Sequence, residues 1–233
     1  MRNGLMMIAA FGLAACGGPA AEAPAPETAA AASSASSAAT ETPTANAEET
    51  VDRSAAPAGV YANDPGHSYI TFSYSHMGYS KPTIRWGSWK AELNWNPAAP
   101  EESSVTATID VDSVDTGVEK LDAHLRSGDF FESETYPTIE FKSASLETTG
   151  PNEGRMTGDL TIKGVTKPIT LDVRINRAAD DGFAKAYKLG FSAKGKLNRS
   201  DFGVDLYVPM VSDEIELSIE SEFVMPKEQP EQP

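Results

Sequence analysis

Alternation of apolar and polar residues, from residue 70 onwards, limits the fold of this chain more than any other feature. Val105, Ala107 and Ile109 are separated by threonines, and a similar two-residue period recurs in seven further segments. A period of two places alternate side chains on opposite faces of a β-strand. The eight segments with this pattern are 70–73, 92–95, 105–111, 139–142, 160–163, 169–175, 188–193 and 214–220.

Strands with one apolar and one polar face indicate an antiparallel sheet, because parallel strands are usually apolar on both faces. Turn-forming residues separate several of the segments, as in Pro151–Gly154 and Gly164–Pro168. Eight such strands can form a sandwich or a closed barrel, and the period alone does not choose between them. We expect an all-β fold with an eight-stranded antiparallel barrel, because closure removes exposed edge strands. A barrel of this size has room for one small ligand.

One short helix is expected near residues 117–127. Thr116 and Glu119 match a capping box, and apolar residues then recur on one helical face. Phe130 and Phe131 follow directly. A short helix that ends in two aromatic residues is well suited to close one mouth of a barrel.

The first sixteen residues predict a targeting signal rather than a part of the folded domain. Arg2 precedes a short apolar run, which is far below the about 20 residues that span a bilayer. The run ends in Leu13-Ala14-Ala15-Cys16, which resembles the bacterial lipoprotein box. We expect residues 1–16 to be a lipoprotein signal peptide with its lipobox, and Cys16 to be lipidated. An ordinary secretory signal with a chance cysteine is the alternative.

The residue after the cysteine is Gly17 rather than aspartate, which favours sorting to the outer membrane. We therefore expect a protein of the cell envelope that is lipid-anchored at the outer membrane and faces the periplasm. Residues 17–59 are mostly Ala, Ser, Thr, Pro and Glu and predict a disordered tether. Residues 60–225 have the length of one domain, and residues 226–233 are expected to be a disordered tail.

Charge and composition exclude several classes of function. The chain has 19 Lys and Arg against 34 Asp and Glu, and its formal net charge of −15 disfavours nucleic-acid binding. One cysteine and three histidines do not predict a metal cluster. The sequence has no nucleophile elbow, phosphate loop or His-Glu-x-x-His motif. We expect no catalytic residues, no catalytic cofactor and no enzyme activity.

A series of short motifs also appears in a specific order. They are Asp64–Ser68, Phe72, His76, Gly78, Ser80, Val114–Gly117, His124–Phe131, Tyr136–Ser143, Gly158–Pro168 and Asn198–Gly203. Their order and spacing resemble the YceI-like family of bacterial periplasmic proteins, over Tyr61 to Phe223. The resemblance implies an extended, lipocalin-like, eight-stranded barrel that binds isoprenoid quinones, polyprenyl chains or similar amphiphiles. The chain departs from the family at Ile84–Trp89, where bulky indoles are expected to narrow or cap the pocket.

Apolar residues of the expected inner face are the candidates for a ligand site. Burial of each ligand methylene contributes about 0.8 kcal/mol, so an apolar tail needs few polar contacts. For each residue the alternative is ordinary core packing. The candidates are Phe72, Trp86, Trp89, Leu93, Ile109, Leu125, Phe130, Phe131, Phe141, Ile162, Leu171, Phe191 and Phe202.

Polar candidates are few. His67 and His76 are expected near the barrel mouth, either as donors to a ligand head group or as structural hydrogen bonds between strands. His124 is expected to be solvated on the polar side of the helix. Arg199 and Asp201 are expected to form an ion pair that fixes the turn before Phe202, with a direct contact to the ligand as the alternative.

The function expected from these observations is non-catalytic binding, transport or storage of a long-chain isoprenoid (a quinone or polyprenol) or a fatty amphiphile in the cell envelope. The partners are then an apolar small molecule and the membrane, through the anchor at Cys16. The sequence leaves the oligomeric state open, and a homodimer is one arrangement that it allows. One alternative is an envelope interaction or stress-response module with a packed barrel and no ligand, and another is an enzyme acting on a lipid-linked substrate.

Overall fold

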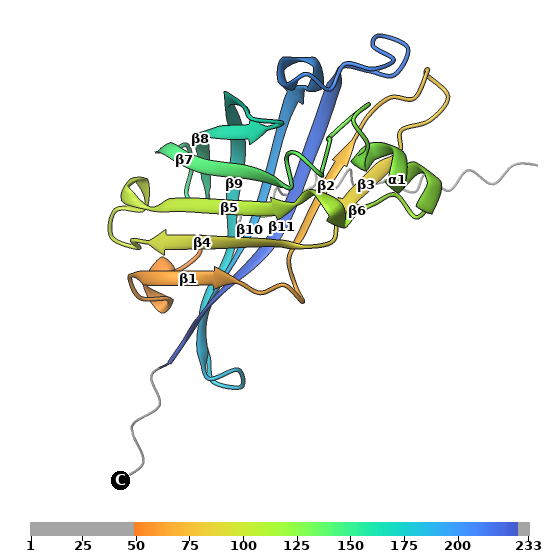
Figure 1. Ribbon diagram of the computed structural model, residues 1–233. Coiled ribbons are helices and arrows are strands. Elements are labelled where there is room, and N and C mark those ends of the chain that lie inside the picture. Colours follow the sequence, from red (N-terminus) through yellow and green to blue (C-terminus); the bar gives the residue numbers. More distant parts are fainter. Residues whose placement is uncertain (1–48, 228–233) are drawn as a thin grey trace, which may run out of the picture. The chain divides into compact units, whose positions relative to one another are not determined.

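The computed structural model describes residues 49–227, which fold into one antiparallel sheet and a short α-helix (Figure 1). The sheet order is β1-β4-β5-β7-β8-β9-β10-β11-β2-β3-β6, and β1 also pairs with β11. The strands are β1 (Gly59–Asn63), β2 (Tyr69–Ser73), β3 (Thr83–Trp86), β4 (Trp89–Trp95), β5 (Ser104–Asp110), β6 (Val114–Asp115), β7 (Thr138–Thr148), β8 (Glu153–Ile162), β9 (Val165–Asp181), β10 (Ala186–Asn198) and β11 (Glu214–Pro226).

These segments make eight long strands, because each of the first three long strands is broken in two. β1 and β2 follow one another along β11, β4 and β3 pair with β1 and β2 respectively, and β5 and β6 pair with β4 and β3. The remaining five strands pair in chain order, and β11 returns to the first strand. The predicted closed, eight-stranded antiparallel barrel is therefore confirmed.

The two-residue period of the sequence is also the period of burial. In β4 the side chains of Trp89, Ala91, Leu93 and Trp95 are buried, while the residues between them are exposed. The inward faces of the strands form one apolar core inside the barrel. The outward faces are polar and carry cross-strand ion pairs, which stabilise a sheet by only a few tenths of a kcal/mol each.

The helix α1 (Glu119–Arg126) lies beside β3 and β6 at one end of the barrel (Figure 1). Its position confirms the predicted helix, but the expected capping box is wrong. The hydroxyl of Thr116 donates to Asp122 Oδ1 at 2.6 Å and its backbone N–H donates to the same oxygen at 2.8 Å. These hydrogen bonds lower the pKa of Asp122. The helix begins at Glu119, so the residue that can reach back to Thr116 lies one turn later.

Two loops lie at the same end of the barrel as α1. They are the β2–β3 loop (residues 74–82) and the β10–β11 loop (residues 199–213). The second begins with a 3₁₀ turn, η4 (Arg199–Phe202). Backbone hydrogen bonds join the two loops, from Met77 N to Met210 O at 3.0 Å and from Ser212 N to Ser75 O at 2.9 Å. Within residues 49–227, no helix is long and apolar enough to pass through a lipid bilayer.

Ordered structure starts earlier than the expected domain boundary at residue 60. Val51 N donates to Asn152 Oδ1 at 2.8 Å, and the indole of Trp95 donates to the carbonyl of the fully buried Ala56 at 3.1 Å. Composition did not reveal this segment, because the two hydrogen bonds use backbone groups of the segment, the N–H of Val51 and the carbonyl of Ala56. The expectations for Cys16, residues 17–48 and residues 228–233 lie outside the described residues.

Candidate functional site

An apolar cavity of about 410 Å³ lies inside the barrel. Inward side chains of all eight long strands line it, together with residues of α1 and of the loops beside the helix. Pockets that enclose small molecules commonly measure about 300 to 1,000 Å³ and are mostly apolar. The barrel is therefore hollow, and its interior can take an apolar molecule out of water.

All thirteen apolar residues predicted for the ligand site line this cavity. Aromatic side chains pack against one another in its wall: Phe72 and Trp86 have ring centroids 5.6 Å apart, and Trp86 meets the ring of Phe131 edge-on at 5.2 Å. Phe191 packs edge-on against Trp95 at 6.0 Å. The contact of these side chains with a ligand stays a prediction, but the structure brings the whole predicted set around one space.

The indoles where the chain departs from the family pattern belong to the wall of the cavity. Trp86 and Trp89 are both buried, and each lines the space without filling it. Trp95 also lines the cavity, and the chain has three tryptophans in all. Intrinsic fluorescence of this protein therefore reports on the cavity.

Polar groups along the cavity lie mainly at the end with α1 and the two loops. Tyr74, His76, His124, Arg199 and Tyr207 line that end. Burial raises the pKa of the Tyr74 phenol. Sequence reasoning missed the two tyrosines, because loop residues have no periodicity that would mark them as inward-facing.

His124 meets its expectation only in part, because its side chain is 37% exposed but also lines the cavity. Its ring packs edge-on against Phe130 with centroids 5.0 Å apart and lines the cavity, while Nε2 lies 3.1 Å from Asp129 Oδ2. The chain turns back directly after α1, and this turn brings the phenylalanine against the last turn of the helix. A helical wheel cannot show such a contact, so His124 was expected in solvent.

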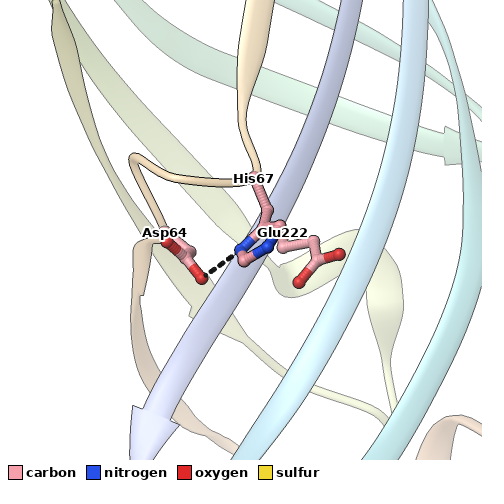
Figure 2. Close-up of side chains that lie close together, drawn as sticks. All are labelled: Asp64, His67 and Glu222. Atoms are coloured by element: carbon pink, nitrogen blue, oxygen red, sulfur yellow. Dashed lines mark hydrogen bonds and ion pairs between the residues drawn. The ribbon is translucent and has the colours of Figure 1, made fainter.

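The two head-group candidates lie in different places. His76 lines the cavity, and its backbone N–H donates to Ser80 O at 2.9 Å, so it takes part in strand pairing and also reaches the ligand space. His67 is not among the residues that line the cavity. Its Nδ1 pairs with Asp64 Oδ2 at 2.9 Å, beside Glu222 of β11 (Figure 2). The position of His67 therefore fits the alternative structural role.

This cluster joins the break between β1 and β2 to β11. The hydrogen bond from His67 lowers the pKa of Asp64, whose Oδ1 also accepts the backbone N–H of Gly66 at 2.9 Å. Lys188 Nζ lies 2.7 Å from Glu222 Oε2, and this hydrogen bond raises the pKa of Lys188. In this cluster Asp64 is hydrogen-bonded to His67, and Glu222 is paired with Lys188.

Arg199 corrects one expectation. The buried guanidinium donates to three backbone carbonyls of its own loop: from Nη1 to Val204 O at 2.7 Å, from Nε to Ser212 O at 2.9 Å and from Nη2 to Val211 O at 3.1 Å. Burial lowers the pKa of Arg199. The expected ion pair with Asp201 is wrong, because the guanidinium turns inward while Asp201 is exposed. The Arg199 side chain therefore holds the β10–β11 loop in place by hydrogen bonds to backbone carbonyls of that loop.

The cavity reaches solvent at the two joined loops, where its exposed lining residues lie. Among the described residues that line it, only His76 of the β2–β3 loop and Tyr207 of the β10–β11 loop are exposed. The other lining residues are buried or half-buried. We call this opening the mouth of the cavity.

Sequence comparison relates this domain to bacterial proteins of one family. The YceI-like domain matches residues 61–223. Protein YceI of Escherichia coli O157:H7 is 35% identical over 161 residues, which cover 69% of this chain and 83% of that protein. A UPF0312 protein of Pseudomonas aeruginosa strain LESB58 is 34% identical over 158 residues, which cover 68% of this chain and 82% of that protein.

Solved structures have the same architecture. The Campylobacter jejuni YCEI protein has a TM-score of 0.60 at 35% identity, covering 66% of this chain and 90% of its own. Burkholderia cenocepacia BcnA has a TM-score of 0.61 at 26% identity, covering 69% and 98%. A polyisoprenoid binding domain from Saccharophagus degradans has a TM-score of 0.55 at 14% identity, covering 72% and 99%, and shares the fold. The matched domain and these relatives together show that the chain belongs to the YceI-like family.

Proposed function

We propose that the barrel binds a long-chain isoprenoid (a quinone or polyprenol) or a similar fatty amphiphile, and carries or stores it without chemical change. The observation that carries this proposal is the apolar cavity of about 410 Å³ inside the barrel. An apolar cavity of about 150 Å³ is already enough to take up benzene. A cavity of this size in a small domain leaves its lining without packing partners, which a bound tail supplies.

The distribution of polar groups supports an amphiphile rather than a plain hydrocarbon. Tyr74, His76, His124 and Tyr207 place hydrogen-bonding groups at the end with the mouth, while the strands farther along present mostly apolar side chains. Each buried methylene of a tail contributes about 0.8 kcal/mol, so the tail supplies affinity and the head group supplies orientation. We place the head group at the mouth and the tail along the barrel.

The likeness to the Saccharophagus degradans domain is consistent with this proposal. That protein is described as a polyisoprenoid binding domain, and its fold is the fold of this chain. At 14% identity the likeness is one of fold, so the ligand of this chain is proposed from its own cavity.

Native protein is expected to carry about one apolar molecule per protein chain, which solvent extraction and mass spectrometry will detect. Protein from which lipid has been removed is expected to take up dansyl-labelled farnesol. Because all three tryptophans line the cavity, uptake is measured as energy transfer from tryptophan to dansyl. Heat-unfolded protein is the control. Extracts without an apolar molecule, together with no uptake of the probe, would contradict the proposal.

We also propose that the domain is held in the cell envelope by a lipid on Cys16, at the outer membrane and facing the periplasm. The supporting observation is the order of an apolar run, Leu13-Ala14-Ala15-Cys16 and then Gly17. Stable anchoring by acyl chains increases with the number of buried methylenes.

Cells that express the chain are expected to incorporate labelled palmitate into it, and the variant Cys16→Ser is expected to incorporate none. The reason is that the sequence has no second cysteine to accept a lipid by this chemistry. Cell fractionation is expected to move most of the variant from the membrane fraction to the soluble fraction. A wild-type chain without label would exclude the anchor and leave the ligand proposal untouched.

A further inference from the structure

Exposed apolar side chains gather around the mouth of the cavity. Within residues 49–227, nine large apolar residues are exposed, and four of them belong to the two loops at the mouth. Their exposed fractions are 52% for Met77, 86% for Tyr79, 49% for Tyr207 and 60% for Met210. We call these four residues the rim. Exposed apolar residues that occur singly need no explanation, but a group around an opening indicates an interaction surface.

The backbone holds the rim in place. Tyr79 N donates to His76 O at 2.9 Å, and Met77 N donates to Met210 O at 3.0 Å, so the two loops support each other. Met77 has φ of 53° and Tyr207 has φ of 66°. Side chains other than glycine rarely adopt this left-handed region, and they do so where the surrounding structure imposes it. The rim residues are therefore presented to solvent by a defined backbone.

The rim is continuous with the ligand space. Tyr207 is exposed and also lines the cavity, and Met77 follows the cavity-lining His76 in the chain. A molecule that enters or leaves through the mouth passes these side chains. Long isoprenoids hardly dissolve in water, since each exposed methylene costs about 0.8 kcal/mol. Exchange through a mouth surrounded by apolar side chains is favourable when that mouth meets an apolar phase.

We propose that the rim docks on the surface of a lipid bilayer, so that the ligand passes between membrane and cavity without crossing water. This inference rests on the proposed function. Tyrosine is enriched where hydrocarbon meets lipid head groups, because it has an apolar ring and a polar end. Docking of this kind inserts side chains into the bilayer interface without spanning it.

Charge indicates which membrane surface the rim fits. The chain has a net charge of −15, and Asp201 and Asp205 are exposed on the β10–β11 loop. Lys81 of the β2–β3 loop is paired with Glu216. These charges do not attract anionic lipids, so we expect docking through apolar contact on zwitterionic lipid, with little dependence on salt.

The experiment compares two sources of the same probe. The full-length chain with Cys16→Ser removes the proposed anchor, and dansyl-labelled farnesol is supplied either in phosphatidylcholine vesicles or by dilution from ethanol. Replacing Tyr79→Ser and Met210→Ser together is expected to slow loading from vesicles about tenfold, because apolar contacts with the interface are lost. Loading from dilution is expected to be unchanged, since neither residue lines the cavity. Tryptophan-to-dansyl energy transfer measures both rates.

Phe183 supplies a matched control. It is 99% exposed and lies in the β9–β10 turn, away from the two loops of the mouth. Phe183→Ser is expected to load from vesicles at the wild-type rate, and low and high salt are expected to give equal rates. Equal rates for the rim variant and the wild type, equal slowing by Phe183→Ser, or loading only after addition of a second protein would overturn the docking inference. Absence of loading from both sources would instead refute the proposed function.

Discussion

Placing a phenylalanine side chain at Ala193 is expected to weaken the binding of dansyl-labelled farnesol about fiftyfold, from the loss of buried methylenes. Ala193 is a buried residue of β10 whose side chain lines the cavity. A phenyl ring there displaces about three ligand methylenes, worth about 2.4 kcal/mol in all. Since about 1.4 kcal/mol is a factor of ten in Kd, the change is readily measured by a titration of tryptophan-to-dansyl energy transfer.

The matched control carries the same ring on the other face of the same strand. Lys194 is exposed on β10, so Lys194→Phe places the ring outside the barrel. We expect this variant to bind with wild-type Kd. Ala193→Phe is expected to keep its stability, because the ring enters empty space. A folded Ala193→Phe variant with unchanged affinity would show that the ligand does not occupy the cavity.

Replacement of Arg199 by alanine is expected to lower the free energy of unfolding by about 3 kcal/mol, the range for losing several charge-assisted hydrogen bonds. The guanidinium donates to the carbonyls of Val204, Val211 and Ser212, and the first of these hydrogen bonds is fully buried. Its removal leaves carbonyls without a donor and frees the β10–β11 loop. Urea unfolding followed by tryptophan fluorescence measures the change.

Arg85 provides the comparison. Its side chain is half exposed, and it meets Asp115 at 3.5 Å on the surface of the barrel. Arg85→Ala is expected to change the free energy of unfolding by about 0.5 kcal/mol or less, as for other exposed ion pairs. Equal effects of the two substitutions would mean that the backbone contacts of Arg199 do not stabilise the loop.

The fold could be predicted to a large extent because every long strand has an inward face that must be apolar. Each of the eight segments with a two-residue period lies in a different long strand of the barrel. The segments that were missed are β1, β3 and β6, which have five, four and two residues. So few residues do not establish a period, and the breaks that isolate them depend on contacts between strands.

The candidate site was predictable only in part, for a related reason. Strand position determines which side chains point inward, so the apolar lining followed from the alternation. The volume that remains between those side chains depends on how they pack across the barrel, as with Trp86 against Phe72 and Phe131. The polar end of the cavity was harder to predict from the sequence. The contacts of His124 and Arg199 are set by turns of the chain, and no local sequence pattern describes those turns.

Because β11 closes the barrel, it also limits the order in which the sheet can form during folding. β11 (Glu214–Pro226) pairs with β10 and with both halves of the first strand, so the most C-terminal strand of the described residues joins the two edges of the sheet. Until it is added, the nascent sheet has two unpaired edges and an uncovered apolar face, a species prone to aggregate. Contacts between residues so distant in the sequence also make folding slow. The apolar inner face of the barrel is therefore closed off only when the C-terminal strand has joined both edges of the sheet.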